Sequence, residues 1–467
     1  MLQIGGLKLK HVPVLDPGFV PAVLWNQAYQ QRVAEHEEAC DLVIALERGG
    51  GSISTRQLRV FPHEGTYVSL NRVYVERIIK FLLWQKGGWK LTIAGSEPIA
   101  DMIRGIYQSD GIRSFDFDYM GCRVFGRSFE IHSCALSEVP AESESSNPLG
   151  RNLDGCRIGF DLGGSDRKCA AVIDGEVVFS EEIAWDPYFE TDPQYHFNGI
   201  MDSLKRASEH LPRVDAIGGS SAGVYVNNEV RAASLFRGIP EALFEAHVKR
   251  IFFKLREVWG NIPFDVVNDG EVTALAGSMS LNDNAVLGVA MGTSEAAGYV
   301  DALGHITTWL NELAFAPIDY REDAPRDEWS GDVGCGVNYF SQQGIGRLAK
   351  LAGFKFPEEM GLPEQLVAVQ EAMAEGDSRA RSIYETTGVQ FGYTIAHYAD
   401  FYEIRNLLIL GRVTSGEGGE IIIAKAKEVL RDEFPEWADC INLVTPNEKD
   451  KRHGQAVAAA SLPSLEL

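Results

Sequence analysis

Short apolar runs that stop at glycine-rich turns recur along the second part of the chain, and they constrain its fold most. These runs, each with the glycine that follows it, are 157–161 before Gly163, 285–290 before Gly292 and 406–410 before Gly411. Segments with helical spacing lie between and beyond them, at 197–210, 240–259, 271–280, 342–351, 362–375 and 378–402. Strands that alternate with helices and end in such turns predict an α/β fold with central sheets.

A polar segment divides the chain into two parts. Residues 137–155 are rich in Ser and Glu, contain two prolines and show neither strand nor helix periodicity, so we interpret them as a linker. Before the linker, buried strands are predicted at 41–47 and 89–94 and helices at 73–84 and 97–107, which together indicate an N-terminal α/β domain over residues 1–136. After it, Asp174-Gly175 between two strand-like runs, 168–173 and 176–180, predicts a hairpin.

The charge of the chain argues against some partners. The 467 residues include 43 Lys+Arg and 66 Asp+Glu, a formal net charge of −23. Residues 1–150 hold 15 of the basic and 17 of the acidic residues, so nearly the whole deficit falls on 151–467. Such a surface repels phosphate backbones and anionic lipid, which disfavours nucleic acid as a partner.

The cysteines and the N-terminus indicate a compartment. The seven cysteines stand apart, with no CxxC pair, at positions 40, 122, 134, 156, 169, 335 and 440. Neither a zinc knuckle nor a redox dithiol is therefore encoded locally. The first residues lack a basic region before an apolar run, and no apolar run approaches the roughly 20 residues that span a bilayer. We predict a cytoplasmic protein with reduced thiols and no membrane segment.

Four strand-end segments carry residues suited to phosphate and hydroxyl chemistry. They are Asp161-Leu-Gly-Gly-Ser165 with Lys168 nearby, Asn268-Asp269-Gly270, Gly292-Thr293 and Gly411. Glycines let the backbone approach a phosphate, and a carboxylate such as Asp161 suits Mg²⁺ held through water. Taken singly, Asn268-Asp269-Gly270 also fits a tight turn with a helix cap, and Gly411 a plain strand terminator. Their order along the chain carries more weight than any one of them.

In that order, and with Asn311-Glu312, these segments resemble the ROK family, which includes sugar kinases and sugar-responsive repressors. The family belongs to the actin-like ATPase and sugar kinase superfamily. The resemblance covers about residues 155–467 and leaves the N-terminal third outside. It implies a two-lobed actin-like (ribonuclease-H-like) fold, with lobes at 156–285 and 286–467, ATP and Mg²⁺ on one side of a cleft and a sugar on the other.

The resemblance also implies a role for each motif residue. Asp269 would be the general base that accepts the proton of the attacking sugar hydroxyl, and Asn268 and Glu312 would hold sugar hydroxyls. Asp161 would hold Mg²⁺ through water. The residues implied to contact the nucleotide and its phosphates are Asp161, Gly163, Gly164, Ser165, Lys168, Gly292, Thr293 and Gly411. Because Asp269 is expected at a helix N-terminus, we expect the helix dipole to keep it ionised.

The chain also departs from the family pattern. No histidine follows Glu312 closely, and the cysteine-rich zinc loop is reduced to residues 332–339 with Cys335 alone, so no zinc is expected. Glu295 would place a negative charge near phosphates unless it points away. Arg412 would stack on adenine or obstruct it.

Three functions therefore stay open. The first is an ATP-dependent kinase of a sugar or polyol, and the second is a sugar-binding regulator that has lost turnover. The third is an ATPase of the same superfamily that acts on a protein partner, such as an activator of a radical enzyme, although Cys156, Cys169 and Cys335 lack the spacing of an iron–sulfur cluster site. The expected partners are a small-molecule sugar and a nucleotide, with a homodimer left open. Trp309 is expected to pack in the core or, three residues before Glu312, to form a wall that stacks on the sugar. The acidic run 319–328 is expected to form a solvated loop or a lid over the cleft.

Overall fold

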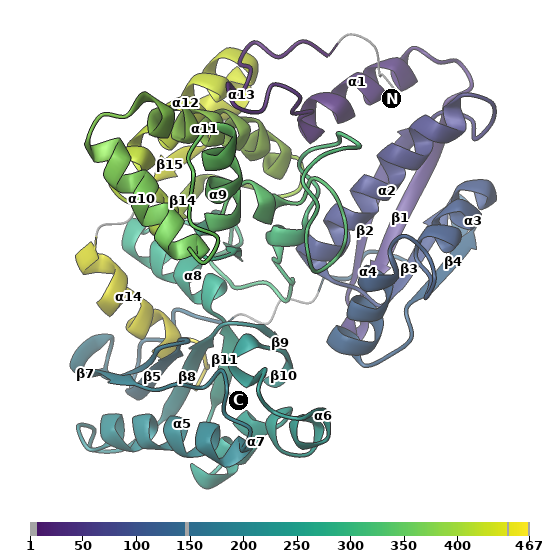
Figure 1. Cartoon of the computed structure of the whole chain (residues 1–467). Helices are drawn as coiled ribbons and strands as arrows, with labels where there is room; N and C mark the ends of the chain where they lie inside the picture. Colours follow the sequence, from purple (N-terminus) through teal and green to yellow (C-terminus); the bar gives the residue numbers. More distant parts are fainter. Residues whose placement is uncertain (1–6, 145–148, 446–447, 466–467) are drawn as a thin grey trace.

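The computed structural model describes residues 7–144, 149–445 and 448–465. It has an N-terminal α/β unit and two further lobes, each built on a β-sheet (Figure 1). The predicted α/β class, with two lobes and an additional N-terminal α/β unit, is confirmed. No helix within these residues is long and apolar enough to cross a membrane. The exact domain boundaries stay predictions.

The N-terminal unit is a four-stranded sheet with helices around it. Its strand order is β2-β1-β3-β4, antiparallel except where β3 pairs with β4. The strands are β1 (Cys40–Glu47), β2 (Ile53–Val60), β3 (Lys90–Ala94) and β4 (Glu130–Cys134). The helices are α1 (Ala22–Ala34), α2 (Tyr67–Lys86), α3 (Glu97–Ile106), α4 (Ser114–Asp118), the 3₁₀ turns η1 (Gly49–Gly51) and η3 (Leu136–Glu138), and the π-helix η2 (Tyr119–Phe125). The predicted strands at 41–47 and 89–94 and helices at 73–84 and 97–107 are confirmed as β1, β3, α2 and α3.

The first lobe has a five-stranded sheet of order β11-β8-β5-β6-β7. Its strands are β5 (Cys156–Leu162), β6 (Asp166–Ile173), β7 (Glu176–Ala184), β8 (Ala216–Ser221) and β11 (Phe264–Asn268). A hairpin of β9 (Val224–Val226) and β10 (Glu229–Ala232), the 3₁₀ turn η4 (Ser234–Phe236) and the helix α5 (Pro193–Ser208) complete it. The predicted Asp174-Gly175 turn joins β6 to β7, with φ of 47° and 85°, the positive values that a tight hairpin needs.

The helix predicted at 240–259 is wrong as a single element. The segment is divided into α6 (Glu241–Leu243), the π-helix η5 (Phe244–Val248) and α7 (Ile251–Val258). The amide of Lys249 bonds to the carbonyl of Phe244, five residues back, and the Lys249 carbonyl accepts from the Val230 amide of β10 at 3.0 Å. Pairing with the neighbouring hairpin therefore interrupts the α-helical ladder, which the local sequence pattern does not indicate.

The second lobe has a four-stranded sheet of order β13-β12-β14-β15. Its strands are β12 (Val286–Met291), β13 (Glu295–Val300), β14 (Asn406–Leu410) and β15 (Asn442–Val444). Its helices are α9 (Gln342–Leu351), α10 (Leu362–Ala374), α11 (Ser378–Ala399), α12 (Glu417–Glu433) and α13 (Pro435–Ala438), with the 3₁₀ turns η6 (Leu313–Phe315), η7 (Gly336–Asn338) and η8 (Arg412–Thr414). Two helices, α8 (Asp269–Leu281) and α14 (Glu448–Ala460), lie between the lobes, where α8 packs on β12 and β13 and α14 on β5 and β8 (Figure 1).

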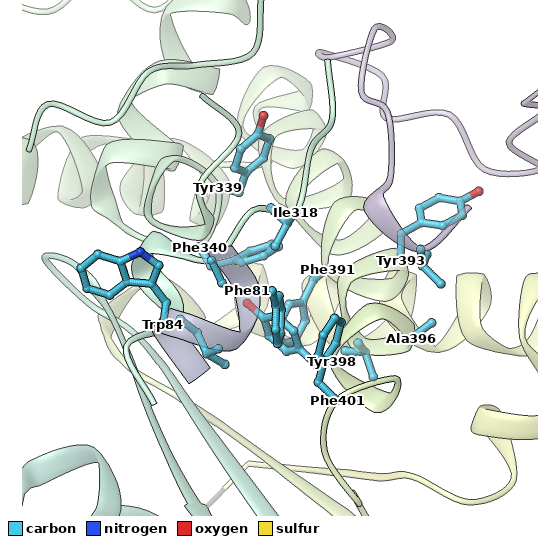
Figure 2. Packing of buried hydrophobic residues seen from close by; sticks show 14 of the residues in the cluster. Phe81, Trp84, Ile318, Tyr339, Phe340, Phe391, Tyr393, Ala396, Tyr398 and Phe401 are labelled. Atoms are coloured by element: carbon cyan, nitrogen blue, oxygen red, sulfur yellow. The ribbon is translucent and has the colours of Figure 1, made fainter. Parts of the chain in front are cut away.

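One apolar core joins the N-terminal unit to the second lobe. Phe81 of α2 stacks on Phe401 with ring centroids 3.8 Å apart, and Trp84 stacks on Phe315 at 4.2 Å. Figure 2 shows Phe81 and Trp84 among residues of the second lobe such as Phe340. The first lobe has a separate core, and the N-terminal unit is therefore integrated with the second lobe rather than appended to it.

A buried ionic cluster reinforces this junction. The Nζ of Lys80 lies 3.1 Å from carboxylate oxygens of both Asp116 and Asp332, and the side chains of Lys80 and Asp116 are fully buried. Arg77 and Arg113 also pair with Asp332, which belongs to a loop of the second lobe. Since unpaired charges are costly to bury, the cluster requires every partner to be present.

The acidic segment 319–328 and Trp309 are both in contact with the core. The run 319–328 is not simply a solvated loop, because Asp319 is buried and accepts a hydrogen bond from the Tyr339 hydroxyl at 2.7 Å. Trp309 is partly buried and packs against the core: its ring stacks on Tyr299 at 5.5 Å, and the Lys86 ammonium lies over the ring, 4.3 Å from its centroid.

Candidate functional site

The motif residues lie where strands of both lobes end. Asp161 is near the end of β5, and Asn268 is the last residue of β11. Met291 and Leu410 end β12 and β14, and these two parallel strands lie side by side. Their carboxyl ends lead into Gly292 and Gly411, whose turns also lie together because Gly411 packs on the backbone of Met291. With φ of 106° and this close contact, position 411 requires glycine.

Asp161 and Lys168 form the polar centre of the first glycine turn. The Nζ of Lys168 lies 3.7 Å from Asp161 and 3.3 Å from Asp166. Burial lowers the pKa of Lys168, but the two carboxylates outweigh it, so the pKa is raised and the ammonium stays charged. Burial also raises the pKa of Asp161, while a hydrogen bond from Ser220 and the charge of Lys168 oppose the increase.

The same turn explains part of its glycine pattern. The amide of Gly163 donates to the Asp166 carbonyl at 2.9 Å, which closes the turn. A Cβ on Gly164 would lie 2.0 Å from the hydroxyl of Tyr188. Ser165 is exposed, and its hydroxyl donates to Asp166 at 2.9 Å. The turn thus presents small residues and one hydroxyl at the strand end, which is the kind of surface that a phosphate approaches closely.

Asp269 begins α8, with Asn268 as its N-cap. The Asn268 side chain accepts from the Gly270 amide at 2.7 Å and donates to the Gly223 carbonyl at 2.8 Å, so it holds the helix end against the β8–β9 turn. Burial, and next the charge of Asp161, raise the pKa of Asp269 to about 6. The helix dipole does not hold this pKa at its usual low value, because burial and the neighbouring carboxylate outweigh it, but a group with a pKa of about 6 is still mainly ionised at pH 7.

Four carboxyl groups form an acidic row through the site: Asp161, Asp269, Glu312 and Glu271. Burial and then Asp269 raise the pKa of Glu312 to about 7. Burial raises the pKa of Glu271 to about 8, and Glu312 adds to the increase while Asn311, which donates to Glu271 at 3.5 Å, opposes it. Each group thus raises the pKa of the next one in the row.

Glu295 and Arg412, the two residues expected to interfere with nucleotide binding, lie in different surroundings. Glu295 is buried and accepts from the Tyr398 hydroxyl at 3.0 Å, so it points into the second lobe. Burial raises its pKa to about 8. Arg412 is exposed beside a pocket of about 410 Å³ that Gln342 and Ser415 also line.

That pocket adjoins both glycine turns of the second lobe. The backbone amide of Gln342 donates to the carbonyl of Gly292 at 2.9 Å, and Arg412 directly follows Gly411. Thr293 is exposed on the first of these turns. A group that fills the pocket could therefore extend phosphates toward Gly292 and Thr293.

The segment 332–339, where the ROK family has its zinc loop, takes part in the buried ionic cluster through Asp332. Cys335 is buried, and its thiol lies 3.9 Å from Asp332. Burial raises the pKa of Cys335, although Lys80 opposes the increase, so the sulfur is held as a thiol. Across residues 7–144, 149–445 and the described part beyond, no group of three His, Cys, Asp or Glu side chains is arranged to hold a metal ion.

The sequence did not indicate that the N-terminal unit reaches the site. The backbone amide of Glu312 donates to the carbonyl of Trp84, and Tyr119 of η2 lies near enough for Glu312 to affect its pKa. Tyr225 of β9 is likewise close to Asp269. Nothing in the motif pattern points to Trp84 or Tyr119, because only the folded chain brings them to Glu312.

Comparisons with known proteins give the fold. A scan of family models finds no match, and no curated protein matches the sequence. The crystal structure of a ROK hexokinase from Thermus thermophilus matches with 17% identity and a TM-score of 0.52, covering 65% of this chain and 97% of that chain. A ROK family transcriptional regulator, a homologue of the E. coli MLC protein, matches with 19% identity and a TM-score of 0.53, covering 66% of this chain and 79% of the other. About two-thirds of this chain therefore has the actin-like fold of ROK kinases and regulators, as its strand-end motifs predict.

Proposed function

We propose that the protein transfers the γ-phosphoryl group of ATP to a hydroxyl group of a sugar or sugar-like polyol. The observation that carries this proposal is the position of Asp269. It lies in the first turn of α8, next to Asp161 and Glu312, with a pKa raised to about 6. A carboxylate with that pKa is ionised at neutral pH and is basic enough to accept a hydroxyl proton late in the reaction.

The other residues of the site orient the acceptor. Glu312, with a pKa of about 7, accepts or donates one hydrogen bond according to its protonation. Asn268 uses its oxygen and one N–H in holding α8, which leaves its second N–H for a sugar hydroxyl. As the bond from the acceptor oxygen to the γ-phosphorus forms, the bond from that phosphorus to the β–γ bridging oxygen breaks, ADP leaves, and the proton of the acceptor hydroxyl passes to a carboxylate oxygen of Asp269. Holding the hydroxyl against that carboxylate is the main contribution of the protein, since phosphoryl transfer depends on alignment and charge stabilisation.

The residues present suit ATP and Mg²⁺. Asp161 offers a partly exposed carboxylate, the kind of oxygen ligand that Mg²⁺ binds while keeping its waters. The phosphates of ATP would be held, against the negative charge of the chain, by Lys168, Thr293 and the amides around Gly163 and Gly292. The adenine base would lie in the pocket beside Arg412. When bound, ATP supplies the phosphoryl group and Mg²⁺ neutralises part of the phosphate charge.

A coupled assay of ADP release tests the proposal over hexoses, amino sugars and polyols. With the acceptor that reacts, we expect Asp269→Asn to lower kcat by about 10²–10⁴-fold, the usual contribution of a general base. Asp439→Asn, an exposed aspartate far along the chain, is the matched control and should keep full activity. If no acceptor gives turnover that depends on Asp269, the kinase proposal fails.

A sugar-binding regulator is the second candidate. The likeness to a ROK family transcriptional regulator favours it, since the same fold serves regulation in that protein. Calorimetry would then detect sugar binding to a protein that releases no ADP with any nucleotide. The third hypothesis, an activator of a radical enzyme, is tested by iron content: burial raises the pKa of Cys169 to about 11, which disfavours the thiolate that an iron–sulfur cluster needs.

A further inference from the structure

The N-terminal unit holds the backbone of the residues proposed to bind the acceptor. Helix α2 ends at Lys86, so the carbonyl groups of its last turn have no partner within the helix. The amide of Asn311 donates to the carbonyl of Gln85 at 2.8 Å, and the amide of Glu312 donates to that of Trp84 at 2.9 Å. The end of α2 therefore fixes where Glu312 stands.

A tyrosine of the same unit lies beside Glu312. Tyr119, the first residue of η2, packs its ring on Trp84 and Phe115 with centroids 5.2 and 5.5 Å away. Burial raises the pKa of its hydroxyl, and the charge of Glu312 adds to the increase. Within the described part of the chain, neither the Tyr119 hydroxyl nor the Glu312 carboxylate has a side-chain hydrogen bond. Two polar groups in a half-buried position are thus left for a ligand.

The same π-helix also reaches the first lobe. It contacts the β9–β10 hairpin, Gly126 at its end lies against Arg231, and Arg123 pairs with Glu241 of α6 at 3.8 Å. Figure 1 shows the N-terminal unit beside both lobes, with α4 near the β9–β10 hairpin. Because α2 packs on the second lobe and η2 on the first, this unit spans the two lobes on the side where Glu312 lies.

We propose that the N-terminal unit forms one wall of the acceptor site, and that Tyr119 is a specificity-determining residue whose hydroxyl binds the acceptor opposite Glu312. This inference rests on the proposed function. The chemistry of the wall selects a neutral polyhydroxylated acceptor: Tyr119 donates a hydrogen bond, Glu312 accepts one, and the aromatic face of Trp84 lies behind them. Carboxylates at 161, 269 and 312 repel an acceptor that carries a phosphate or carboxylate of its own.

The test compares acceptor binding and turnover in four variants. Tyr119→Phe removes the hydroxyl alone, and Tyr119→Ala removes the wall. Tyr67→Phe and Tyr67→Ala are the matched controls, because Tyr67 stacks on Phe61 at the opposite end of α2. For each, calorimetry measures the affinity for the preferred sugar without nucleotide, and steady-state kinetics measure KM for the sugar, KM for ATP and kcat.

We expect Tyr119→Phe to weaken sugar binding by about tenfold, the loss of one hydrogen bond, with KM for ATP changed less than about twofold. Tyr119→Ala should also narrow the difference in kcat/KM between the preferred sugar and bulkier ones. If wild type binds a sugar and both variants at position 119 bind it equally well, the inference is overturned while the proposed function stands. If the wild type binds no neutral sugar, both fall together. Loss of binding in the Tyr67 controls as well would overturn the inference in favour of a general effect on stability.

Discussion

Replacing Lys80 by methionine tests whether the buried ionic cluster holds the N-terminal unit on the second lobe. Methionine has nearly the same length and no charge. The substitution therefore leaves the two carboxylates that Lys80 contacts, those of Asp116 and Asp332, without the positive charge of Lys80. Asp332 keeps Arg77 and Arg113 as partners. Asp116 keeps only the indole N–H of Trp84, in a position with no exposure to solvent.

The expected loss follows from that imbalance. Breaking one partner of a buried ion pair costs about 3–5 kcal/mol, because the remaining charge stays buried without compensation. We therefore expect Lys80→Met to lower the free energy of unfolding by about that amount, and Lys80→Met with Asp116→Asn to recover part of it. Lys350→Met, at an exposed lysine, should change it by less than about 0.5 kcal/mol.

The dependence on pH gives a second check with a definite sign. Burial already raises the pKa of Asp116, and Lys80 holds the increase down. Without Lys80 the folded-state pKa rises further above the unfolded value, so the variant keeps a proton that the unfolded chain releases. Its stability therefore falls as pH increases, and the loss should be smaller near pH 5 than near pH 8.

Equilibrium urea unfolding, followed by tryptophan fluorescence and circular dichroism, measures these values. The free energy of unfolding in the absence of urea is then compared among the variants. A loss below about 1 kcal/mol for Lys80→Met would refute the argument, and so would an Asp116→Asn change that adds to the loss instead of reducing it.

Three further predictions concern single groups. Because Asp269 must be ionised to accept a proton and its pKa is about 6, kcat/KM for the sugar should rise with pH up to about 6 and then level off; a flat profile from pH 5 to 8 would exclude it as the base. Glu295, with a folded pKa of about 8, lowers stability as pH rises from about 4.5 to 8, so Glu295→Gln should raise the melting temperature more at pH 8 than at pH 5, and an equal shift at both would contradict this. Gly164→Ala places a Cβ against the Tyr188 hydroxyl and should raise KM for ATP with a stable fold, whereas the double variant with Tyr188→Phe should recover part of the loss; unchanged kinetics in the single variant would disprove the contact.

Much of the fold was accessible from local pattern. The strand predicted at 406–410 is β14 with the same bounds, and the helix predicted at 342–351 is α9, because apolar period and flanking turns determine both. The helix predicted at 240–259 failed for a non-local reason. A hydrogen bond from Val230, in a hairpin before the segment, interrupts it, and no property of the segment itself encodes that pairing.

The site divides in the same way. The strand-end motifs indicated Asp161, Asp269 and Gly411 because each lies at the end of a strand. The fold brings Asp161 close enough to Asp269 to raise its pKa, and it places Gly411 beside Met291 in the second lobe. The ionisation of Asp269 was not accessible, since its pKa depends on burial and on Asp161, more than 100 residues away in the chain. Tyr119 could not be found either, because its contact with the site exists only once α2 has docked on the second lobe.

The continuous core between the N-terminal unit and the second lobe has a consequence for motion. An apolar junction that includes Phe81 and a set of buried charges does not slide, whereas η2 meets the first lobe through the short β9–β10 hairpin and the largely exposed pair of Arg123 and Glu241. The molecule should therefore behave as two rigid bodies, with the N-terminal unit travelling with the second lobe. Because α8 packs on β12 and β13, Asp269 in its first turn lies against the same body as Tyr119 and Glu312, whereas Asp161 belongs to the sheet of the first lobe. A rotation between the bodies would then change the distance from Asp161 to these three residues more than the distances among them. A ligand that reaches from this group to Asp161 would draw the bodies together, so that its entry and the assembly of the reactive geometry become one event.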